Sequence, residues 1–251
     1  MKLIISPAKK MNRQEDSVPW QDLPTFLDKT RILMDYICSL SLSQARGLWR
    51  CNEALADLNY RRFQEMDLER RLTPAVLAYE GIQYQYMAPQ VFDQASLDYV
   101  QAHLRILSGF YGILRPLDGV VPYRLEMQAK IDLTLNGQTF HSLYDFWSRQ
   151  LYEALAEEDS VIVNLASKEY SKAVEPFLAH KNQMIHVIFG SLDENSKVRQ
   201  KATEAKMARG EMIRYLAEIQ AEKAEDLKGF TRLGYQFHPE LSDENHYAFI
   251  K

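Results

Sequence analysis

The stretch LRILSGFYGILRPLDGVVPYRLEM, from Leu104 to Met127, combines a largely apolar run with three arginines, three glycines and two prolines. Gly109 and Gly112 bracket the aromatic pair Phe110 and Tyr111. Because glycine adopts backbone conformations that other residues avoid, the chain can turn tightly or approach a ligand closely here. The stretch therefore predicts either a buried strand with a tight turn or a ligand-binding turn.

Arg105, Arg115 and Arg124 are spaced along the same stretch. Arg115 precedes a proline, which favours extended backbone at that position. Arginine forks on stiff backbone suit the recognition of phosphate or carboxylate groups. Alternatively, the arginines of a buried strand and its turn pair with acids such as Asp118 and Glu126. The residue types leave both interpretations open.

On both sides of this stretch, predicted strands alternate with predicted helices along the chain. Apolar runs at Val161–Leu165 and Met184–Phe189 predict buried strands, and the helical segment SKEYSKAVEPFL separates them. Further strands are predicted at Lys2–Ser6, at Ala75–Tyr79 and, as a hairpin, at Gly234–Phe237 with His246–Ile250. Helical spacing marks residues 22–65, 93–104, 142–157 and 197–224. The order indicates an α/β fold, a single domain over residues 1–251 with a mixed, partly parallel sheet flanked by helices.

The composition is 46% hydrophobic and 25% charged, which is ordinary for a globular protein. No apolar run is long enough to span a bilayer, and MKLIISPAKK lacks the apolar region of a signal peptide. The two cysteines, Cys38 and Cys51, give no disulfide framework. We therefore expect a cytoplasmic protein with no membrane partner.

The formal net charge of −4 argues against a protein that coats nucleic acid with positive charge. Two segments are nevertheless basic, because residues 2–13 and 197–214 carry an excess of lysine and arginine. An acidic protein with basic islands can still present a local anion-binding cleft.

The first basic island contains Ser6-Pro7-Ala8-Lys9, directly after the first predicted strand. A serine cap and a proline at the first helical position would aim backbone N–H groups at a bound anion, with Lys9 and Lys10 beside them. The same SxxK spacing occurs in serine–lysine acyl enzymes, although their companion motifs are missing. A capped turn with exposed lysines is the third interpretation.

The second basic island is a predicted helix on which Arg199, Lys206, Arg209 and Arg214 share one broad face. Gly210 leaves a gap in the side chains of that face. A phosphate backbone would fit closely in such a gap, whereas the alternative is a solvated face on a surface helix.

Polar residues also follow the VIVNL strand, where Asn164 is followed by Ser167, Lys168 and Glu169. Ligands of open α/β sheets gather at the carboxyl ends of the strands, so this position favours a binding site. The histidines form none of the common metal motifs. His238 and His246 flank acidic residues, but the segment is more typical of an acidic turn, and we expect neither a metal nor a cofactor.

Several segments in order resemble the YaaA family of bacterial peroxide stress response proteins, long listed as uncharacterised. They are LIISPAK, LRILSGFYGILRPLD, PYRLEM, LYDFW, VIVNLASKEY and AKMARG. The resemblance covers nearly the whole chain. It implies a cytosolic protein that limits iron-dependent oxidative damage, with an unusual α/β topology, a positively charged cleft and binding to DNA.

The resemblance also implies a helix-hairpin-helix-like element, and LSGFYG is the stretch most similar to its glycine hairpin. Such a hairpin binds a DNA phosphate through backbone N–H groups, here those near Gly109 and Gly112. Ser108 stands where proline is usual. The positions that match the family best are Ser6, Lys9, Arg105, Ser108, Gly109, Tyr111, Gly112, Arg115, Pro116, Tyr123, Arg124, Asn164, Lys168, Lys206, Arg209 and Gly210.

Two functional hypotheses follow. In the first and preferred one, the protein is not an enzyme, and a basic cleft binds the phosphate backbone of duplex or distorted DNA without sequence preference. Its binding residues would be Lys9, Lys10, Arg105, Gly109, Gly112, Arg115, Arg124, Lys168, Lys206, Arg209 and Arg214. In the second, an enzyme acts on a nucleotide, nucleobase or nucleic acid in a pocket around Ser6, Lys9, Tyr111, Arg115 and Asn164, with Ser6, Lys9 and Tyr111 as catalytic candidates.

Overall fold

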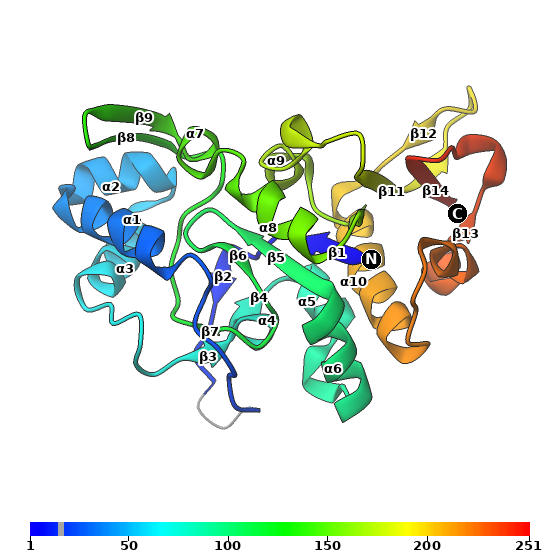
Figure 1. The fold of residues 1–251 in the computed structure, drawn as a ribbon, viewed down its shortest axis with the longest axis horizontal. Coiled ribbons are helices and arrows are strands. Elements are labelled where there is room, and N and C mark those ends of the chain that lie inside the picture. Colours follow the sequence, from blue (N-terminus) through cyan, green and yellow to red (C-terminus); the bar gives the residue numbers. More distant parts are fainter. Residues whose placement is uncertain (15–17) are drawn as a thin grey trace.

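A mixed sheet runs through the middle of the computed structural model, which describes residues 1–14 and 18–251 (Figure 1). Its strand order is β13-β14-β11-β10-β1-β5-β6, and β12 pairs with β11. The strands β5, β1, β10, β11 and β14 are parallel neighbours, whereas β6, β12 and β13 are antiparallel to theirs. The predicted α/β class with a partly parallel sheet is confirmed.

The strands have the following bounds: β1 (Lys2–Ile5), β2 (Lys10–Met11), β3 (Thr73–Pro74), β4 (Tyr79–Glu80), β5 (Leu104–Ser108), β6 (Gly112–Leu114), β7 (Gly119–Val120), β8 (Lys130–Leu135), β9 (Gln138–Ser142), β10 (Val161–Asn164), β11 (Gln183–Leu192), β12 (Val198–Arg199), β13 (Gln236–Phe237) and β14 (His246–Ile250). Outside the main sheet, three short ladders pair β2 with β4, β3 with β7 and β8 with β9.

The α-helices are α1 (Leu27–Ser39), α2 (Leu42–Trp49), α3 (Glu53–Gln64), α4 (Ala75–Ala78), α5 (Ile82–Met87), α6 (Gln94–His103), α7 (Leu143–Trp147), α8 (Gln150–Glu158), α9 (Lys168–Ser171) and α10 (Ala202–Glu218). In the view of Figure 1, α8 and α9 lie above the central strands, and α5, α6 and α10 lie below them. None of the helices in the described part combines the length and apolar character that a membrane crossing requires.

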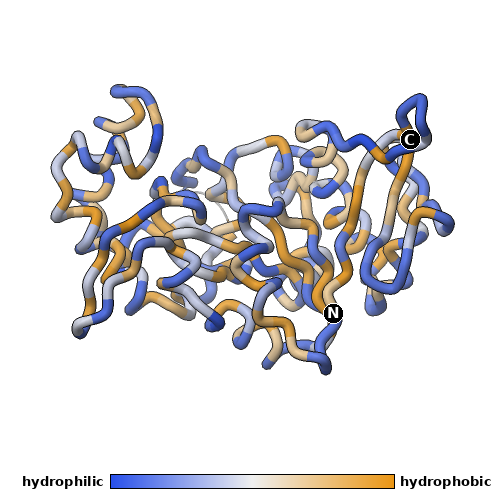
Figure 2. The backbone as a smooth tube through the Cα atoms, turned by 90° about the horizontal axis from the view of Figure 1, so that it is seen from above, coloured by the Kyte–Doolittle hydropathy of each residue, from blue (hydrophilic) through white to orange (hydrophobic). Residues whose placement is uncertain are grey.

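The central strand β1 is apolar because it is covered on both sides. Leu3, Ile4 and Ile5 have no exposed surface, and their neighbours Ile106 and Ile162 are equally buried. A run of consecutive apolar residues, rather than an alternating one, is typical of a strand with both faces covered. In Figure 2 the tube that leaves the N label enters the molecule in hydrophobic colour.

The segment LSGFYG forms a β-hairpin, and the predicted helix-hairpin-helix element is wrong at this place. Ser108 pairs with Gly112 across the turn that joins β5 to β6. The Ser108 hydroxyl caps that turn by accepting hydrogen bonds from the backbone N–H groups of Phe110 and Tyr111, at 3.2 and 2.9 Å. The apolar residues on both sides lie inside the sheet, so they extend as strands.

Other elements also differ from the predictions. The predicted helical segment SKEYSKAVEPFL contains only the four-residue helix α9 and a 3-10 turn at Glu175–Phe177. Ala75–Tyr79, expected as a strand, is mostly the short helix α4, because four apolar residues buried on all sides carry no period. The basic segment 197–224 begins with β12, and its helix, α10, starts only at Ala202. The terminal hairpin of β13 and β14 is confirmed.

Helix α10 lies against α5 at the position of Gly210. A Cβ atom placed there would lie 2.1 Å from the Gln83 carbonyl oxygen and 2.9 Å from the Met87 nitrogen. The predicted gap in the basic face exists, but the backbone of α5 fills it, so a phosphate cannot. This close approach fixes the position of α10 relative to α5.

We expect Gly210→Ala to lower the free energy of unfolding by about 1–3 kcal/mol, because the added methyl group must push two helices apart. Urea unfolding followed by circular dichroism measures the change. The control is Gly47→Ala on α2, where nothing lies within 4 Å of the new Cβ atom. That variant should be more stable by up to about 1 kcal/mol, because alanine favours the helix. A Gly210→Ala protein as stable as the control variant would contradict this account of the packing.

Candidate functional site

A cavity of about 390 Å³ lies at the carboxyl ends of β1 and β10. Ser6 follows β1 directly, and Ser167 lies three residues after the end of β10. The other walls come from α5, α10 and the extended segment 123–126. The lining residues are Ser6, Pro7, Ala8, Lys9, Lys10, Glu80, Gly81, Ile82, Gln83, Tyr84, Tyr123, Arg124, Leu125, Glu126, Ser167, Glu169, Tyr170, Lys206 and Arg209.

The position of the cavity follows from the strand order. From β1 the chain goes on to β5 on one side of the sheet, whereas from β10 it goes on to β11 on the other side. The pair β1 and β10 is therefore the switch point, where successive connections leave in opposite directions. Such points open a crevice at the carboxyl ends of the strands, which is the usual ligand site of this architecture.

Three hydrogen bonds hold the walls together. The Ser6 hydroxyl accepts from the backbone N–H of Ser167 at 2.8 Å and lies 3.1 Å from the Ser167 hydroxyl. The Tyr84 hydroxyl on α5 donates to the Ser6 carbonyl oxygen at 3.1 Å. The loops after β1 and β10 are thus joined to each other and to α5. Ser6 has a clear structural role in this arrangement.

Three of the cations in the cavity already have carboxylate partners. Glu126 contacts Lys9 at 2.9 Å and Arg124 at 3.2 Å, one with each carboxylate oxygen. Lys10 pairs with Glu80 at 2.5 Å. Lys9 is thus directed to Glu126, while the Ser6 hydroxyl is directed to Ser167. The arrangement gives no support to a serine–lysine nucleophile.

Lys206 and Arg209 have no such partner. Neither forms a hydrogen bond or ion pair with any residue in the described part of the chain, and the Nε atom of Arg209 is buried without an acceptor. Burial lowers the pKa of the Arg209 guanidinium below its ordinary value. An arginine still remains charged at neutral pH. The cavity therefore contains a half-buried positive charge that no described residue neutralises.

Glu169 also lines the cavity. Burial and the nearby charge of Glu126 raise the pKa of its carboxyl group, although the backbone N–H of Gln128 donates to it at 3.2 Å. A raised pKa weakens the negative charge that Glu169 contributes. The electrostatic balance of the cavity is therefore positive.

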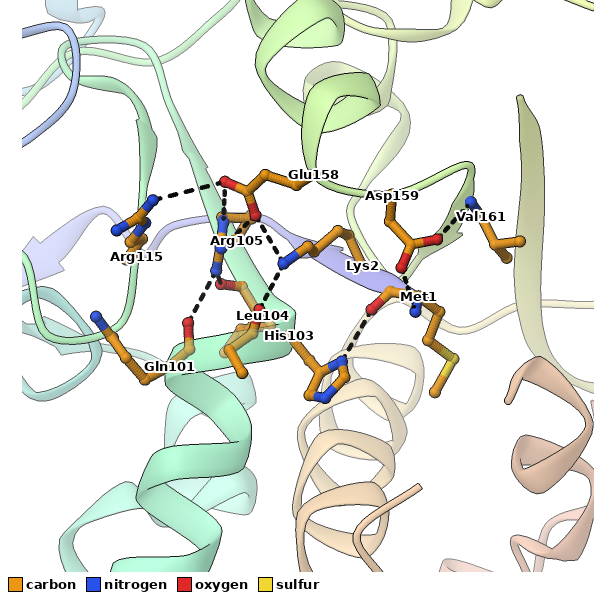
Figure 3. Close-up of polar contacts among 11 residues, drawn as sticks. Met1, Lys2, Gln101, His103, Leu104, Arg105, Arg115, Glu158, Asp159 and Val161 are labelled. Carbon is orange, nitrogen blue, oxygen red and sulfur yellow. Dashed lines mark hydrogen bonds and ion pairs between the residues drawn. The ribbon is translucent and has the colours of Figure 1, made fainter. Parts of the chain in front are cut away.

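Arg105 and Arg115 lie at the other end of the sheet, and neither lines the cavity. Arg105 is 4% exposed and makes a two-pronged contact with Glu158, while its Nη1 atom donates to the carbonyl oxygens of Gln101 and Leu104 (Figure 3). Lys2 joins the same carboxylate at 2.7 Å, and Arg115 lies 4.0 Å from it. The structure thus matches the alternative in which these arginines pair with acids, although the acid is Glu158.

The remaining predicted residues are dispersed. Gly109 and Gly112 are buried, and a Cβ atom at either would contact neighbouring atoms at 2.6 and 2.8 Å, so no phosphate reaches their backbone. Lys168 is exposed at the start of α9 and does not line the cavity. Arg214, farther along α10, pairs with Glu218 at 2.9 Å.

The five residues of the enzyme hypothesis do not meet in one pocket. Ser6 and Lys9 line the cavity, whereas Tyr111 is buried in the core, where its hydroxyl accepts from the backbone N–H of Val121. The Asn164 side chain lies 3.0 Å from His186 and accepts from the N–H of Ala166. It shapes the loop that carries Ser167 rather than lining the cavity.

Metal chemistry has no visible ligand set in the described ranges. There, no three His, Cys, Asp or Glu side chains are grouped in a way that would hold a metal ion. His246 instead contacts Asp243 at 3.0 Å and stacks on His186.

Among the lining residues that the sequence analysis did not single out are Gln83, Tyr84 and Tyr170. Gln83 and Tyr84 belong to LAYEGIQYQYM, and Tyr170 belongs to the segment after VIVNL. Tyr170 could have been predicted, because the residues after the VIVNL strand were already expected to form the site. Helix α5 is only six residues long and has no charge pattern to mark it.

The fold and the cavity define an α/β protein with a cation-lined cavity at the switch point of its sheet. A profile of the family described as "Peroxide stress protein YaaA" matches residues 1–241. The chain is similar to UPF0246 proteins of Agathobacter rectalis (49% identity over 249 residues, 99% of this chain and 98% of the relative) and Desulfitobacterium hafniense (49% over 251 residues, 100% and 98%). A UPF0246 protein of Pediococcus pentosaceus is 48% identical over 251 residues, again with 100% and 98% covered. The chain belongs to the YaaA family of peroxide stress proteins.

The Arg105–Glu158 network gives a pH-dependent prediction. Partial burial raises the pKa of the Glu158 carboxyl, but the hydrogen bonds and charges of Arg105 and Lys2 outweigh it, so the pKa lies below its ordinary value. The stabilisation is therefore complete above the unfolded-state pKa, about 4.3, and is lost as pH falls through the folded-state pKa. Glu158→Gln should lower the free energy of unfolding at pH 7 by about 1–2 kcal/mol.

Urea unfolding from pH 7 to pH 3 measures this difference, which should shrink below about pH 4.3. The control is Glu157→Gln, which changes an exposed neighbour and should leave stability nearly unchanged. A Glu158→Gln effect of equal size at pH 7 and pH 3 would show that the ion pairs are not its cause.

Proposed function

We propose that this protein binds DNA through phosphate contacts made by the cations at its switch-point cavity, and that bound protein limits iron-dependent oxidative damage. The proposal combines the family's link to peroxide stress with the charges of the site. The proposal rests on Lys206 and Arg209, because they are the cations of the cavity that have no carboxylate partner in the described chain. Lys9, Lys10 and Arg124 add to the field around them.

Phosphate contacts of this kind carry no sequence information, since every nucleotide presents the same group. The net charge of −4 supports a local contact over a broad coating. Protein bound to the DNA would then protect it by covering it. The bound protein keeps iron, and the radicals that form at the iron, away from the deoxyribose. This activity needs no turnover and no metal ligands on the protein.

The experiment compares the affinity for a four-way junction and a matched duplex over a salt series. Each lost phosphate contact should reduce the slope of log K against log salt by about 1, so Lys206→Ala/Arg209→Ala should reduce it by about 2. Fluorescence anisotropy with labelled DNA gives both affinity and slope.

The matched control is Arg149→Ala/Lys181→Ala, which removes one arginine and one lysine that do not line the cavity. This control lowers the net charge by the same amount as Lys206→Ala/Arg209→Ala. An equal loss of DNA affinity in the two double variants would show that overall charge, and not the cavity, determines binding. Wild-type protein that fails to bind either DNA at about 50 mM salt would overturn the proposal.

A further inference from the structure

Three hydrogen-bond donors around the cavity lack an acceptor. Gln83 Nε2, Arg124 Nε and Arg209 Nε are buried, and none has a partner among the described residues. Gln83 is 6% exposed, so water has little access to its amide. A buried N–H without a partner is costly, and native structures keep few of them. Three donors and no acceptor indicate a ligand rich in acceptor oxygens.

The charges that line the cavity also favour a ligand rich in acceptor oxygens, because their sum is positive. Five cationic side chains and three carboxylates give a net charge of +2. A phosphomonoester carries a charge of about −1.5 to −2 at pH 7 and three strong acceptor oxygens. An internal phosphodiester carries a single charge. The charge of the cavity fits the first better than the second.

The shape of the cavity also favours a terminal group. About 390 Å³ is within the range of small-ligand sites, so the cavity can hold one nucleotide, whereas a duplex would contact its cations only from the mouth. An internal phosphodiester has chain on both sides, whereas a terminal phosphate can enter a pocket from one direction. Partly exposed Pro7, Ala8 and Ile82 supply apolar surface for the attached nucleoside.

We infer that the cavity binds the phosphomonoester group of a nucleotide, with the phosphate held by Arg209, Lys206 and Arg124 and the nucleoside against Pro7, Ala8 and Ile82. Two sources present this chemistry: a free mononucleotide and a phosphorylated DNA strand end. Radical cleavage of deoxyribose leaves phosphomonoesters at strand ends, and this second source rests on the proposed function.

The first arm of the test measures binding by calorimetry and thermal shift at 0.15 M salt. The probes are thymidine 5′-monophosphate, thymidine 3′-monophosphate, thymidine and inorganic phosphate. A monophosphate should bind at least about tenfold more tightly than thymidine or inorganic phosphate, since only it reaches both the cations and the apolar wall. Equal binding of monophosphate and inorganic phosphate would overturn the nucleotide assignment.

The second arm uses duplexes that differ only in a 3′-phosphate or 3′-hydroxyl end, and competition with the monophosphates. Tighter binding of phosphorylated ends assigns the strand-end source. Binding of the monophosphates with no preference between ends assigns the free nucleotide. Absence of both effects overturns the inference.

Variants test the assigned contacts. Arg209→Ala should weaken monophosphate binding by about 10- to 100-fold, and Arg209→Lys, which keeps the charge without the fork, should weaken it less. Gln83→Glu, nearly equal in size, places a carboxylate beside the phosphate and should also weaken binding. Arg149→Ala is the control, and each variant is first checked for native thermal unfolding. An Arg209→Ala protein that folds and binds normally would overturn the assignment.

The two proposals fail in different ways. If Lys206→Ala/Arg209→Ala reduces duplex affinity but neither monophosphates nor phosphorylated ends bind better than their controls, only the phosphomonoester inference fails. If monophosphates bind through Arg209 but no DNA binds at about 50 mM salt, the proposed DNA function fails and the free nucleotide remains as the ligand.

Discussion

The position of β1 between two parallel neighbours is the constraint on which the rest of the structure depends. Its residues Leu3 and Ile4 pair with β5 on one side and β10 on the other, and both are fully buried. A strand in this position must run straight through the core and leave it at one edge of the sheet. Ser6 is the first residue beyond that edge, and the loop after β10 emerges beside it. The place of the cavity and the contact between Ser6 and Ser167 follow from this position of β1, whereas α10 adds Lys206 and Arg209.

Arginine has two opposite functions in this protein. Arg105 is buried at the amino edge of the parallel strands, where Glu158 and two carbonyl oxygens satisfy it. Arg209 is half-buried near the carboxyl edge, where no described residue satisfies it. The first arginine is paired within the fold, whereas the second carries a charge that no described residue pairs. The degree of burial does not distinguish Arg105 from Arg209. The two arginines differ in whether the protein supplies hydrogen-bond acceptors to the guanidinium group.

Local patterns explain what could be predicted from the sequence. The apolar runs of β1 and β10 are buried on both faces and β11 is mostly buried, so composition alone identifies them. Ala75–Ala78 has the same composition but forms a helical turn, since four residues are too few to show a period. The partner of Arg105 could not be predicted, because Glu158 lies 53 positions away. The LSGFYG turn could be placed because its glycines mark it, but the residue types left open whether the stretch is a strand with a tight turn or a ligand-binding turn.

The central position of β1 also has a consequence for synthesis of the protein. During translation β1 leaves the ribosome long before its partners, because Leu3 pairs with Leu104 and Val163. Until those residues emerge, a short apolar strand with two unpaired edges is exposed to other nascent chains. Contacts of such long range also slow folding, since the chain must close large loops before they form. The arrangement that creates the cavity thus leaves the first strand of the nascent chain without its neighbours until residues 104 and 163 have been synthesised.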